Sequence, residues 1–193
     1  MEYTGERGTM ITVTPATAIR DAGPGDFDAV RKVASAANEE FRSPMGDLLF
    51  EGYLANVLDV ATRARDGVVL VAVDGAEVVG TITVYRDINE EGIPVSFPAG
   101  TAGIRATAVS PTRRGRGMGA ELVNAAIARA RSFGARTVAL HTAPCMHDAM
   151  RLYERHGFQR VPGHDFRANA FFAAEDGETL DALALVLDLD SSD

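Results

Sequence analysis

The chain contains a single cysteine, Cys145, among its 193 residues. One cysteine excludes an internal disulfide and fits a reducing compartment, so we expect a cytoplasmic protein. The sequence also lacks an apolar run of the roughly 18 residues that a transmembrane helix requires, which argues against a membrane partner. Residues 1–15 contain no apolar stretch typical of a secretory signal, and we expect them to form a flexible N-terminal extension.

Basic residues are outnumbered by acidic ones. Lys32 is the one lysine, and 19 basic residues against 27 acidic residues give a formal net charge of −8. Nucleic acid is therefore not an expected partner, because binding it requires a basic surface. The acidic balance would tolerate or attract a cationic substrate. The length fits one domain, which we place at residues 16–193. We expect no metal site.

Hydrophobic periodicity predicts alternating strands and helices. Strands are expected at residues 17–20, 68–73, 77–85, 103–109, 137–142 and 180–189. Helices are expected at residues 26–41, 47–65, 119–133 and 146–156, with Ser43 and Pro44 interrupting between the first two. Asp74-Gly75 between two apolar runs favours a hairpin with a type I′ turn. Residues 86–101 resemble a loop, because they contain two glycines and two prolines.

The most informative segment is residues 113–120, Arg-Arg-Gly-Arg-Gly-Met-Gly-Ala, between a predicted strand and a predicted helix. Three glycines in five residues let the backbone approach a bulky ligand without Cβ clashes. The start of a helix offers unpaired N–H groups and the positive end of the helix dipole. Arg113, Arg114 and Arg116 add charge, so this segment is a candidate anion site.

The residues alone do not identify the anion. A phosphate loop of the GxxxxGK[ST] type is excluded, because no lysine followed by serine or threonine is present. Gly115, Gly117 and Ala120 match the GxGxxA variant of the dinucleotide fingerprint. Against it, the linker 110–114 is long, and strand 137–142 ends without the acid that would hold a ribose hydroxyl. The pattern therefore indicates a pyrophosphate site or, alternatively, an arginine-bearing surface loop.

Two blocks resemble the GNAT (Gcn5-related) N-acetyltransferase family. Arg114-x-x-Gly117-x-Gly119, after a strand ending in Ala-Val-Ser-Pro, is similar to the family's acetyl-CoA loop. Residues 149–158, Ala-Met-Arg-Leu-Tyr-Glu-Arg-His-Gly-Phe, resemble its Leu-Tyr-x-x-x-Gly-Phe segment between a helix and a strand. The blocks occur in the family's order, with a strand between them. The resemblance covers residues 16–189, and its specific motifs lie within residues 101–160.

The resemblance implies an α/β fold of the α+β type. Its sheet would be mixed and mostly antiparallel, with a central parallel pair of splayed strands and helices on both faces. Strands 103–109 and 137–142 would form that pair, and backbone around Ala106 would contact the pantetheine arm. Acetyl-CoA or another acyl-CoA would be the cosubstrate and an amine the acceptor; homodimers are frequent in the family. The implied cofactor-binding residues are Ala108, Val109, Arg114, Gly115, Arg116, Gly117, Met118, Gly119 and Ala120.

The chemistry requires an acid and a base. A protonated amine must lose a proton before it can attack a thioester, and the departing thiolate leaves more easily when protonated. Tyr153 stands where the family places the proposed general acid; alternatively it is a packing residue. Many members carry a glutamate on the strand before the loop, but residues 103–109 contain no acid. His141 is a candidate base or water relay, or a structural histidine; Glu90 and Glu91 could edge the pocket or form an exposed pair.

Other side chains are open to two interpretations. In the family, the first two helices form part of the acceptor pocket, so Phe41, Phe50 and Tyr53 could line it or belong to the core. Met146 stands where many members have an asparagine that contacts the cofactor arm. The remaining candidates near the site are Cys145, at the thiol end, and His164 and Asp165, which could fold over it.

Three functions follow from these observations. The first is an acetyl-CoA-dependent N-acetyltransferase acting by direct transfer to an amine. The second is a non-catalytic acyl-CoA-binding module or sensor, which the missing strand acid favours and Tyr153 disfavours. The third is a nucleotide-dependent enzyme that uses the GxGxxA variant.

Overall fold

The computed structural model describes residues 18–172 and 179–190, so the expected extension at residues 1–15 lies outside the described part. The strands are β1 Ala18–Asp21, β2 Val68–Asp74, β3 Glu77–Tyr85, β4 Thr101–Val109, β5 Thr137–Thr142, β6 Gln159–Arg160, β7 Phe166–Arg167 and β8 Asp181–Asp188. The α-helices are α1 Phe27–Asn38, α2 Arg42–Met45, α3 Asp47–Leu58, α4 Val60–Asp66, α5 Met118–Ser132, α6 His147–Arg155 and α7 Ala168–Phe171. Short 3₁₀ turns include η3 Ile88–Glu91 and η4 Pro111–Arg113.

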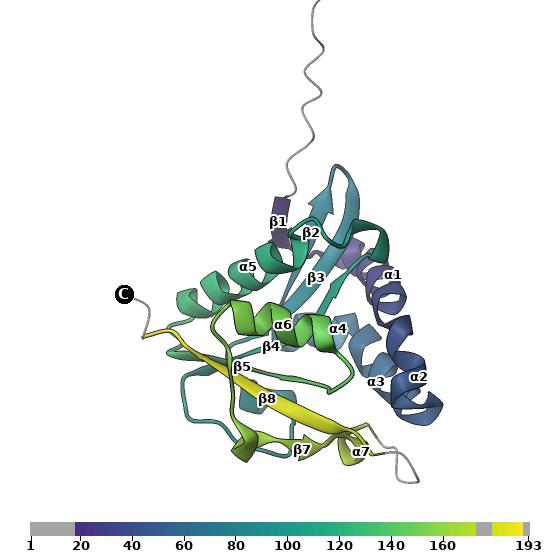
Figure 1. The fold of residues 1–193 in the computed structure, drawn as a ribbon. Helices are drawn as coiled ribbons and strands as arrows, with labels where there is room; N and C mark the ends of the chain where they lie inside the picture. The colour runs from purple at the N-terminus through teal and green to yellow at the C-terminus, as the bar shows by residue number, and fades with distance from the viewer. Residues whose placement is uncertain (1–17, 173–178, 191–193) are drawn as a thin grey trace, which may run out of the picture.

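The strands form one mixed sheet in the order β1-β2-β3-β4-β5-β8-β6, with β7 also paired to β8 (Figure 1). β4 and β5 are parallel, and the other pairs of the described strands are antiparallel. The parallel pairing is short: it joins residues 101–103 to residues 137–139 and then stops. β5 stays paired with β8 as far as Thr142, so β4 and β5 separate at their carboxyl ends. The predicted splayed pair and mixed sheet are confirmed.

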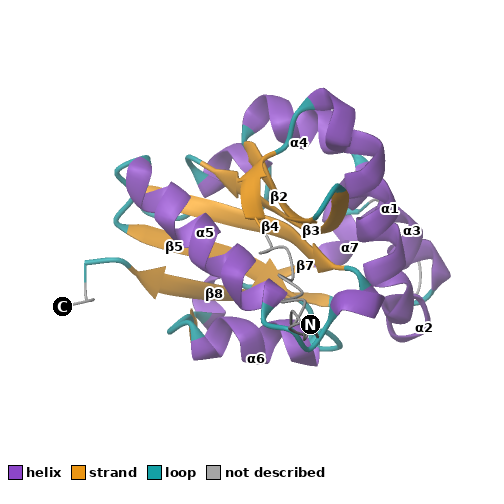
Figure 2. Cartoon of the chain, turned by 90° about the horizontal axis from the view of Figure 1, so that it is seen from above, coloured by secondary structure: helices purple, strands orange, loops and turns teal. Residues whose placement is uncertain are grey.

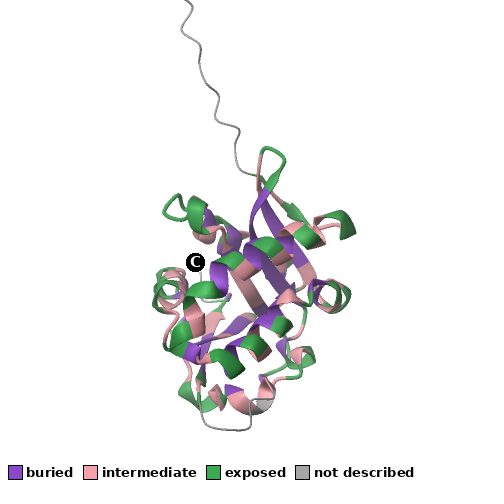
Figure 3. Cartoon of the chain, turned by 90° about the vertical axis from the view of Figure 1, so that its right-hand side faces the viewer, coloured by how far each residue is buried: buried purple, intermediate pink, exposed green. Residues whose placement is uncertain are grey.

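Both faces of the sheet are covered by helices. Leu70 and Ala72 of β2 pack in the cluster that contains Leu122 of α5, whereas Val69 and Val71 pack with α1 and α4. Successive strand residues point to opposite faces, so burial on both faces explains the continuous apolar run of β2. Figure 2 gives the view from above, and Figure 3 shows buried residues on the central strands and exposed residues on the helices' outer sides.

Two helix boundaries differ from the expected ones. Ser43 and Pro44 do not interrupt the helical structure, because both lie in the first turn of α2. At this position the N–H that proline lacks would have no helical partner. The break comes at Gly46, whose φ is 78°. The helix expected at residues 47–65 is two helices, because Asp59 leaves helical geometry and its carboxylate caps α4 by accepting from the Thr62 N–H.

The β2–β3 hairpin formed as predicted, but its turn type was wrong. Asp74 pairs with Glu77, so the turn residues are Gly75 and Ala76. Gly75 has a φ of 62°, whereas Ala106 is the only non-glycine with positive φ in the described residues. Positive φ at the first turn residue alone is the pattern of a type II′ turn.

Candidate active site

A β-bulge opens β4 at the point where β5 leaves it. The β3–β4 register passes from Thr81 opposite Ala108 to Thr83 opposite Arg105, so β4 contains one extra residue. Ala106 lies in this segment with a φ of 51°. A bulge bends a strand and increases its twist. Beyond Gly103, the β5-facing edge of β4 therefore has no strand partner among the described residues.

A cavity of about 550 Å³ lies where β4 and β5 separate. Its lining comes from α1, the loop before α5, the bulged part of β4, α6 and α7, which lie far apart in the sequence. Of the residues expected to bind the cofactor, those that line the cavity are Ala108, Val109, Arg114, Gly115, Gly117, Met118, Gly119 and Ala120. Arg116 does not line it, and its side chain is exposed.

The loop before α5 leaves backbone amides open at one end of the cavity. Gly115 and Gly117 have φ values of 77° and 83°, and a Cβ on either would meet no atom within 4 Å. Gly117 is the N-cap of α5, and no side chain caps this helix. The amides of residues 118–120 are therefore available to an anion, and the helix dipole favours negative charge there.

Gly119 has a different reason for lacking a side chain. A Cβ at this position would approach Leu152 Cδ2 of α6 at 3.2 Å. Gly119 thus lets α6 pack close to the start of α5, which brings Tyr153 towards the splayed strands.

Arg113 and Arg114 of the loop have different partners. Arg113 forms ion pairs with Asp74, at 3.0 Å, and with Glu77, at 3.2 Å, on the β2–β3 hairpin, away from the cavity. Arg114 lines the cavity, donates to the carbonyl of Ala37 at 2.8 Å and pairs with Glu40 at 2.7 Å. Arg114 therefore links the loop to the end of α1.

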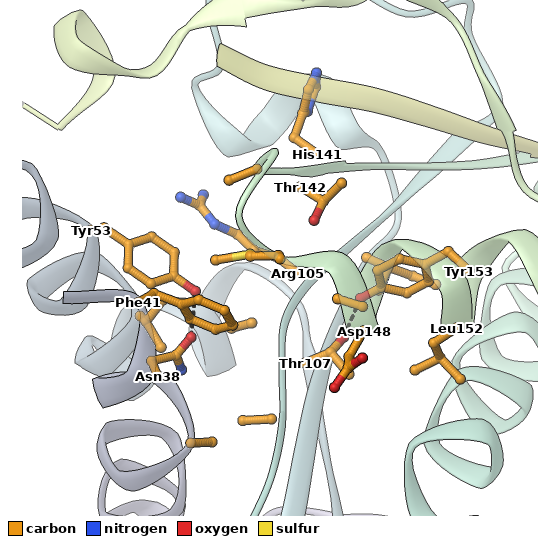
Figure 4. A pocket seen from close by; sticks show the side chains of 18 of the residues that line it. Asn38, Phe41, Tyr53, Arg105, Thr107, His141, Thr142, Asp148, Leu152 and Tyr153 are labelled. Carbon is orange, nitrogen blue, oxygen red and sulfur yellow. Dashed lines mark hydrogen bonds between the residues drawn. The ribbon is translucent and has the colours of Figure 1, made fainter. Parts of the chain in front are cut away.

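Tyr153 of α6 reaches into the splay from the side of α5. Its side chain is 6% exposed, and its hydroxyl donates to Thr107 Oγ1 of β4 at 2.9 Å (Figure 4). Burial raises the pKa of the Tyr153 phenol above its ordinary value, and the bond with Thr107 opposes part of that rise. The phenol is therefore protonated at neutral pH, and both residues line the cavity.

His141 is tied to structural partners. Its Nε2 lies 2.9 Å from the carbonyl oxygen of His164, which can only accept, so Nε2 carries the proton. The ring lies edge-on to Phe97 at 5.8 Å and to Phe166 at 4.8 Å. Burial lowers the pKa of His141, which keeps the ring neutral. His141 lines the cavity, but its ring points away from Tyr153 (Figure 4).

His164 and Asp165 do not line the cavity. The His164 ring stacks on Phe97 at a centroid distance of 4.4 Å. Asp165 forms a two-point ion pair with Arg160 and accepts from the Ala184 N–H at 2.8 Å. Both residues therefore hold the segment that pairs with β8.

The aromatic candidates divide between cavity and core. Phe41 and Tyr53 line the cavity, whereas Phe50 is fully buried outside it. The Tyr53 hydroxyl donates to Asn38 Oδ1 at 2.7 Å, which fixes the ring at the cavity wall (Figure 4).

Met146, at the position of the family's asparagine, and Cys145, expected at the thiol end, differ in their relation to the cavity. Met146 lines the cavity, directly before α6. Cys145 is partly buried outside the lining, and burial raises the pKa of its thiol, so a nucleophilic thiolate is disfavoured.

Glu90 and Glu91 have different environments. Glu90 is exposed, whereas the Glu91 side chain is only 6% exposed and lines the cavity. Glu91 Oε2 lies 3.6 Å from Arg105 Nη1, and Oε1 is buried without a hydrogen-bond partner. Burial raises the pKa of Glu91 to about 8, and Arg105 opposes this.

The model of the acetyltransferase (GNAT) family matches residues 28–158, more than half of the chain. The chain belongs to this GNAT family. The matched range contains both the glycine loop and Tyr153. No curated protein sequence matches the chain.

Solved structures of this family share the fold. The PaiA N-acetyltransferase of Thermoplasma acidophilum, in complex with coenzyme A, is 14% identical, with a TM-score of 0.65 over 90% of this chain and 99% of that chain. A ribosomal-protein-alanine N-acetyltransferase from Brucella melitensis is 19% identical, with a TM-score of 0.63 over 89% and 99%. A GNAT acetyltransferase from Brucella melitensis, in complex with acetyl-CoA, is 28% identical, with a TM-score of 0.54 over 74% and 82%. These likenesses support acetyl-CoA-dependent acetyl transfer in general.

No helix within residues 18–172 and 179–190 is long and apolar enough to cross a membrane. In the same part of this GNAT protein, no three His, Cys, Asp or Glu side chains are grouped as metal ligands.

Several cavity residues of this GNAT protein were not singled out from the sequence. Arg105 and Thr107 lie on β4, and Phe171 and Phe172 lie at the end of α7. The sequence did mark Arg105, because it is the one charged residue in this strand, and a buried charge usually has a partner or a function. Phe171 and Phe172 had no such signal, since no periodic pattern surrounds them.

Proposed function

We propose that this protein is an N-acetyltransferase that moves the acetyl group of acetyl-CoA directly to an amine acceptor, with residues 16–193 as one catalytic domain. One observation carries the proposal: a single cavity joins the open amides at the start of α5 to the buried Tyr153–Thr107 pair in the splay. The amides suit a pyrophosphate, and the phenol suits a departing thiolate.

The loop and the bulge would hold the cosubstrate. Gly115, Gly117 and the amides of residues 118–120 supply an anion site without metal. The free edge of β4 around Ala106 and Ala108 offers backbone groups to the amide-bearing pantetheine arm in a strand-like pairing. The acyl end would then lie near Tyr153, in the part of the cavity that α1 and α7 complete.

Tyr153 would act as general acid. The acceptor nitrogen attacks the thioester carbonyl, and the C–S bond breaks as the intermediate collapses. Tyr153 gives its proton to the sulfur, and it is reset with a proton from solvent after the nitrogen has lost one. Thr107 orients the phenol, because its Oγ1 accepts the phenolic hydrogen bond before the sulfur does.

Binding calorimetry tests the cofactor half of the proposal. Acetyl-CoA should bind with measurable heat, whereas NAD and ATP should not, because strand β5 ends without an acid for the ribose. Tight NAD binding in place of acetyl-CoA binding would favour the nucleotide-dependent enzyme. Acetyl-CoA binding with no CoA release against a panel of amines would favour the sensor.

The Arg114→Ala substitution should weaken acetyl-CoA binding by about 1 kcal/mol, at the low end for a charge-assisted contact. The effect is small because Arg114 already pairs with Glu40 and the Ala37 carbonyl. Calorimetry would measure it against Arg116→Ala, whose side chain is exposed outside the cavity and should change affinity less. A larger loss with Arg116→Ala would contradict the assignment of these two arginines.

A further inference from the structure

Strand β4 contains no acidic residue, but the carboxylate of Glu91 packs against it at Gly103. A Cβ added to Gly103 would stand 2.1 Å from Glu91 Oε1, so the Glu91 carboxylate fills the place that a side chain at position 103 would take. Glu91 reaches this place from the turn η3, which packs against β4. The absence of a side chain at Gly103 is therefore what admits the carboxylate to the strand.

The Glu91 carboxylate has few partners for a buried acid. Oε1 has no hydrogen-bond partner, and the 3.6 Å to Arg105 Nη1 is too long for a hydrogen bond. Tyr85 of β3 also interacts with Glu91, and burial together with Glu91 raises the pKa of Tyr85 to about 12. Arg63 opposes the rise in the pKa of Tyr85 and donates hydrogen bonds to Thr83 and the Val57 carbonyl.

Such an arrangement is costly for folding. A buried polar atom without a hydrogen bond destabilises the folded state, and a charged one does so more strongly. Since Glu91 also lines the cavity, a hydrogen-bond donor that enters the cavity can supply its carboxylate with a partner. An ammonium group is a suitable donor, because it offers three N–H bonds and a positive charge.

The other wall of the same cavity is apolar. Tyr53 meets Phe172 edge-on at a centroid distance of 5.7 Å, and Phe171 meets Phe172 at 4.9 Å. All three rings line the cavity, and the Arg105 guanidinium lies 5.0 Å from the Phe171 ring centre. This wall suits an apolar body next to the ammonium group.

We propose that Glu91 is the proton acceptor for the acceptor substrate, and that this substrate is an aliphatic primary amine on an apolar body. The inference rests on the proposed function. Glu91 takes one proton from R–NH₃⁺, and the neutral amine attacks the thioester carbon. The nitrogen then loses a second proton to solvent while Tyr153 protonates the sulfur. Glu91 releases its proton to solvent after the product leaves, so each turnover frees one proton.

The pH dependence has a definite sign. Burial raises the pKa of Glu91 to about 8, so the carboxylate is the base above that pH and is protonated below it. With a cationic amine, kcat/KM should rise with pH and level off near pH 8. If the free amine were instead taken from solution, the rise would continue to the amine's own pKa, about 10. A plateau only near pH 10 would contradict the role of Glu91 without any mutation.

Glu91→Gln tests the role directly, with Glu90→Gln as its matched control, since Glu90 is the exposed neighbour. At about pH 8.5 the Glu91 carboxylate is ionised and 2-phenylethylamine is still mostly cationic, so with this amine Glu91→Gln should lower kcat about 100- to 10,000-fold, the usual range for general base catalysis. With aniline, which is neutral at the same pH, the loss should stay below about 10-fold, because no proton has to be removed first. Glu90→Gln should match the wild type with both amines.

The outcomes separate two failures. An equal loss of kcat with both amines would assign Glu91 a structural role. No loss of kcat with either amine would contradict its role as the base. A wild type that acetylates spermidine but not 2-phenylethylamine overturns the apolar acceptor. A wild type that releases no CoA with any amine overturns the proposed function itself.

Discussion

The Gly117→Asp variant should fold and yet bind acetyl-CoA at least about 100-fold more weakly, a loss of about 2.7 kcal/mol. Gly117 has a φ of 83°, a conformation that aspartate tolerates better than most residues, and a Cβ there meets open space. The added carboxylate would stand beside the amides that begin α5, where the phosphates are expected to bind. It would repel them and occupy the same N–H groups.

Gly117→Asn separates charge from bulk. Asparagine has nearly the same size as aspartate and also tolerates left-handed backbone, but it carries no charge. Its loss of affinity, measured by calorimetry, should be clearly smaller than that of Gly117→Asp. Unchanged acetyl-CoA affinity in a folded Gly117→Asp protein would contradict the placement of the pyrophosphate on this loop.

Tyr153→Phe should leave acetyl-CoA affinity intact and lower kcat by about 10- to 1000-fold. The substitution removes one oxygen and keeps the ring beside Phe158, so packing is preserved. General acid catalysis contributes about 100- to 10,000-fold, and water can replace part of it. Thr107→Val should cost less, because it removes the acceptor that orients the phenol but leaves the acid.

The pH profile distinguishes the acid from a packing residue. In the wild type, kcat should fall at high pH as the phenol loses its proton, above the usual tyrosine value because burial raises the pKa of Tyr153. That fall should be absent in Tyr153→Phe. A variant with normal turnover and an unaltered profile would assign Tyr153 to packing.

The parts of the site that follow a local pattern were predictable. The glycine loop, the helix after it and the position of Tyr153 depend on short spacings, and the structure places them around one cavity. The short parallel pairing of β4 and β5 also agrees with the splay that the family resemblance implied. Their roles in catalysis remain predictions.

The parts that depend on distant contacts were not predictable. The bulge at Ala106 adds one residue to β4. The alternation of side chains along a regular strand therefore does not predict which side of the sheet Arg105 and Thr107 face. Glu90 and Glu91 are neighbours with equal charge, and only the packing of η3 on Gly103 buries one of them. Gly103 opens the predicted strand 103–109 with no turn motif beside it, and this glycine was the available signal of such a close approach.

The most direct test of acetyl transfer is a turnover measurement with acetyl-CoA labelled in the acetyl group. Wild-type protein, acetyl-CoA and a panel of primary amines would be followed by mass spectrometry and by a thiol assay. The account predicts labelled N-acetyl product and free CoA in equal amounts, no acetyl group left on the protein, and much less of both products with Gly117→Asp at the same acetyl-CoA concentration. Tight acetyl-CoA binding without CoA release or N-acetyl product from any amine would contradict it.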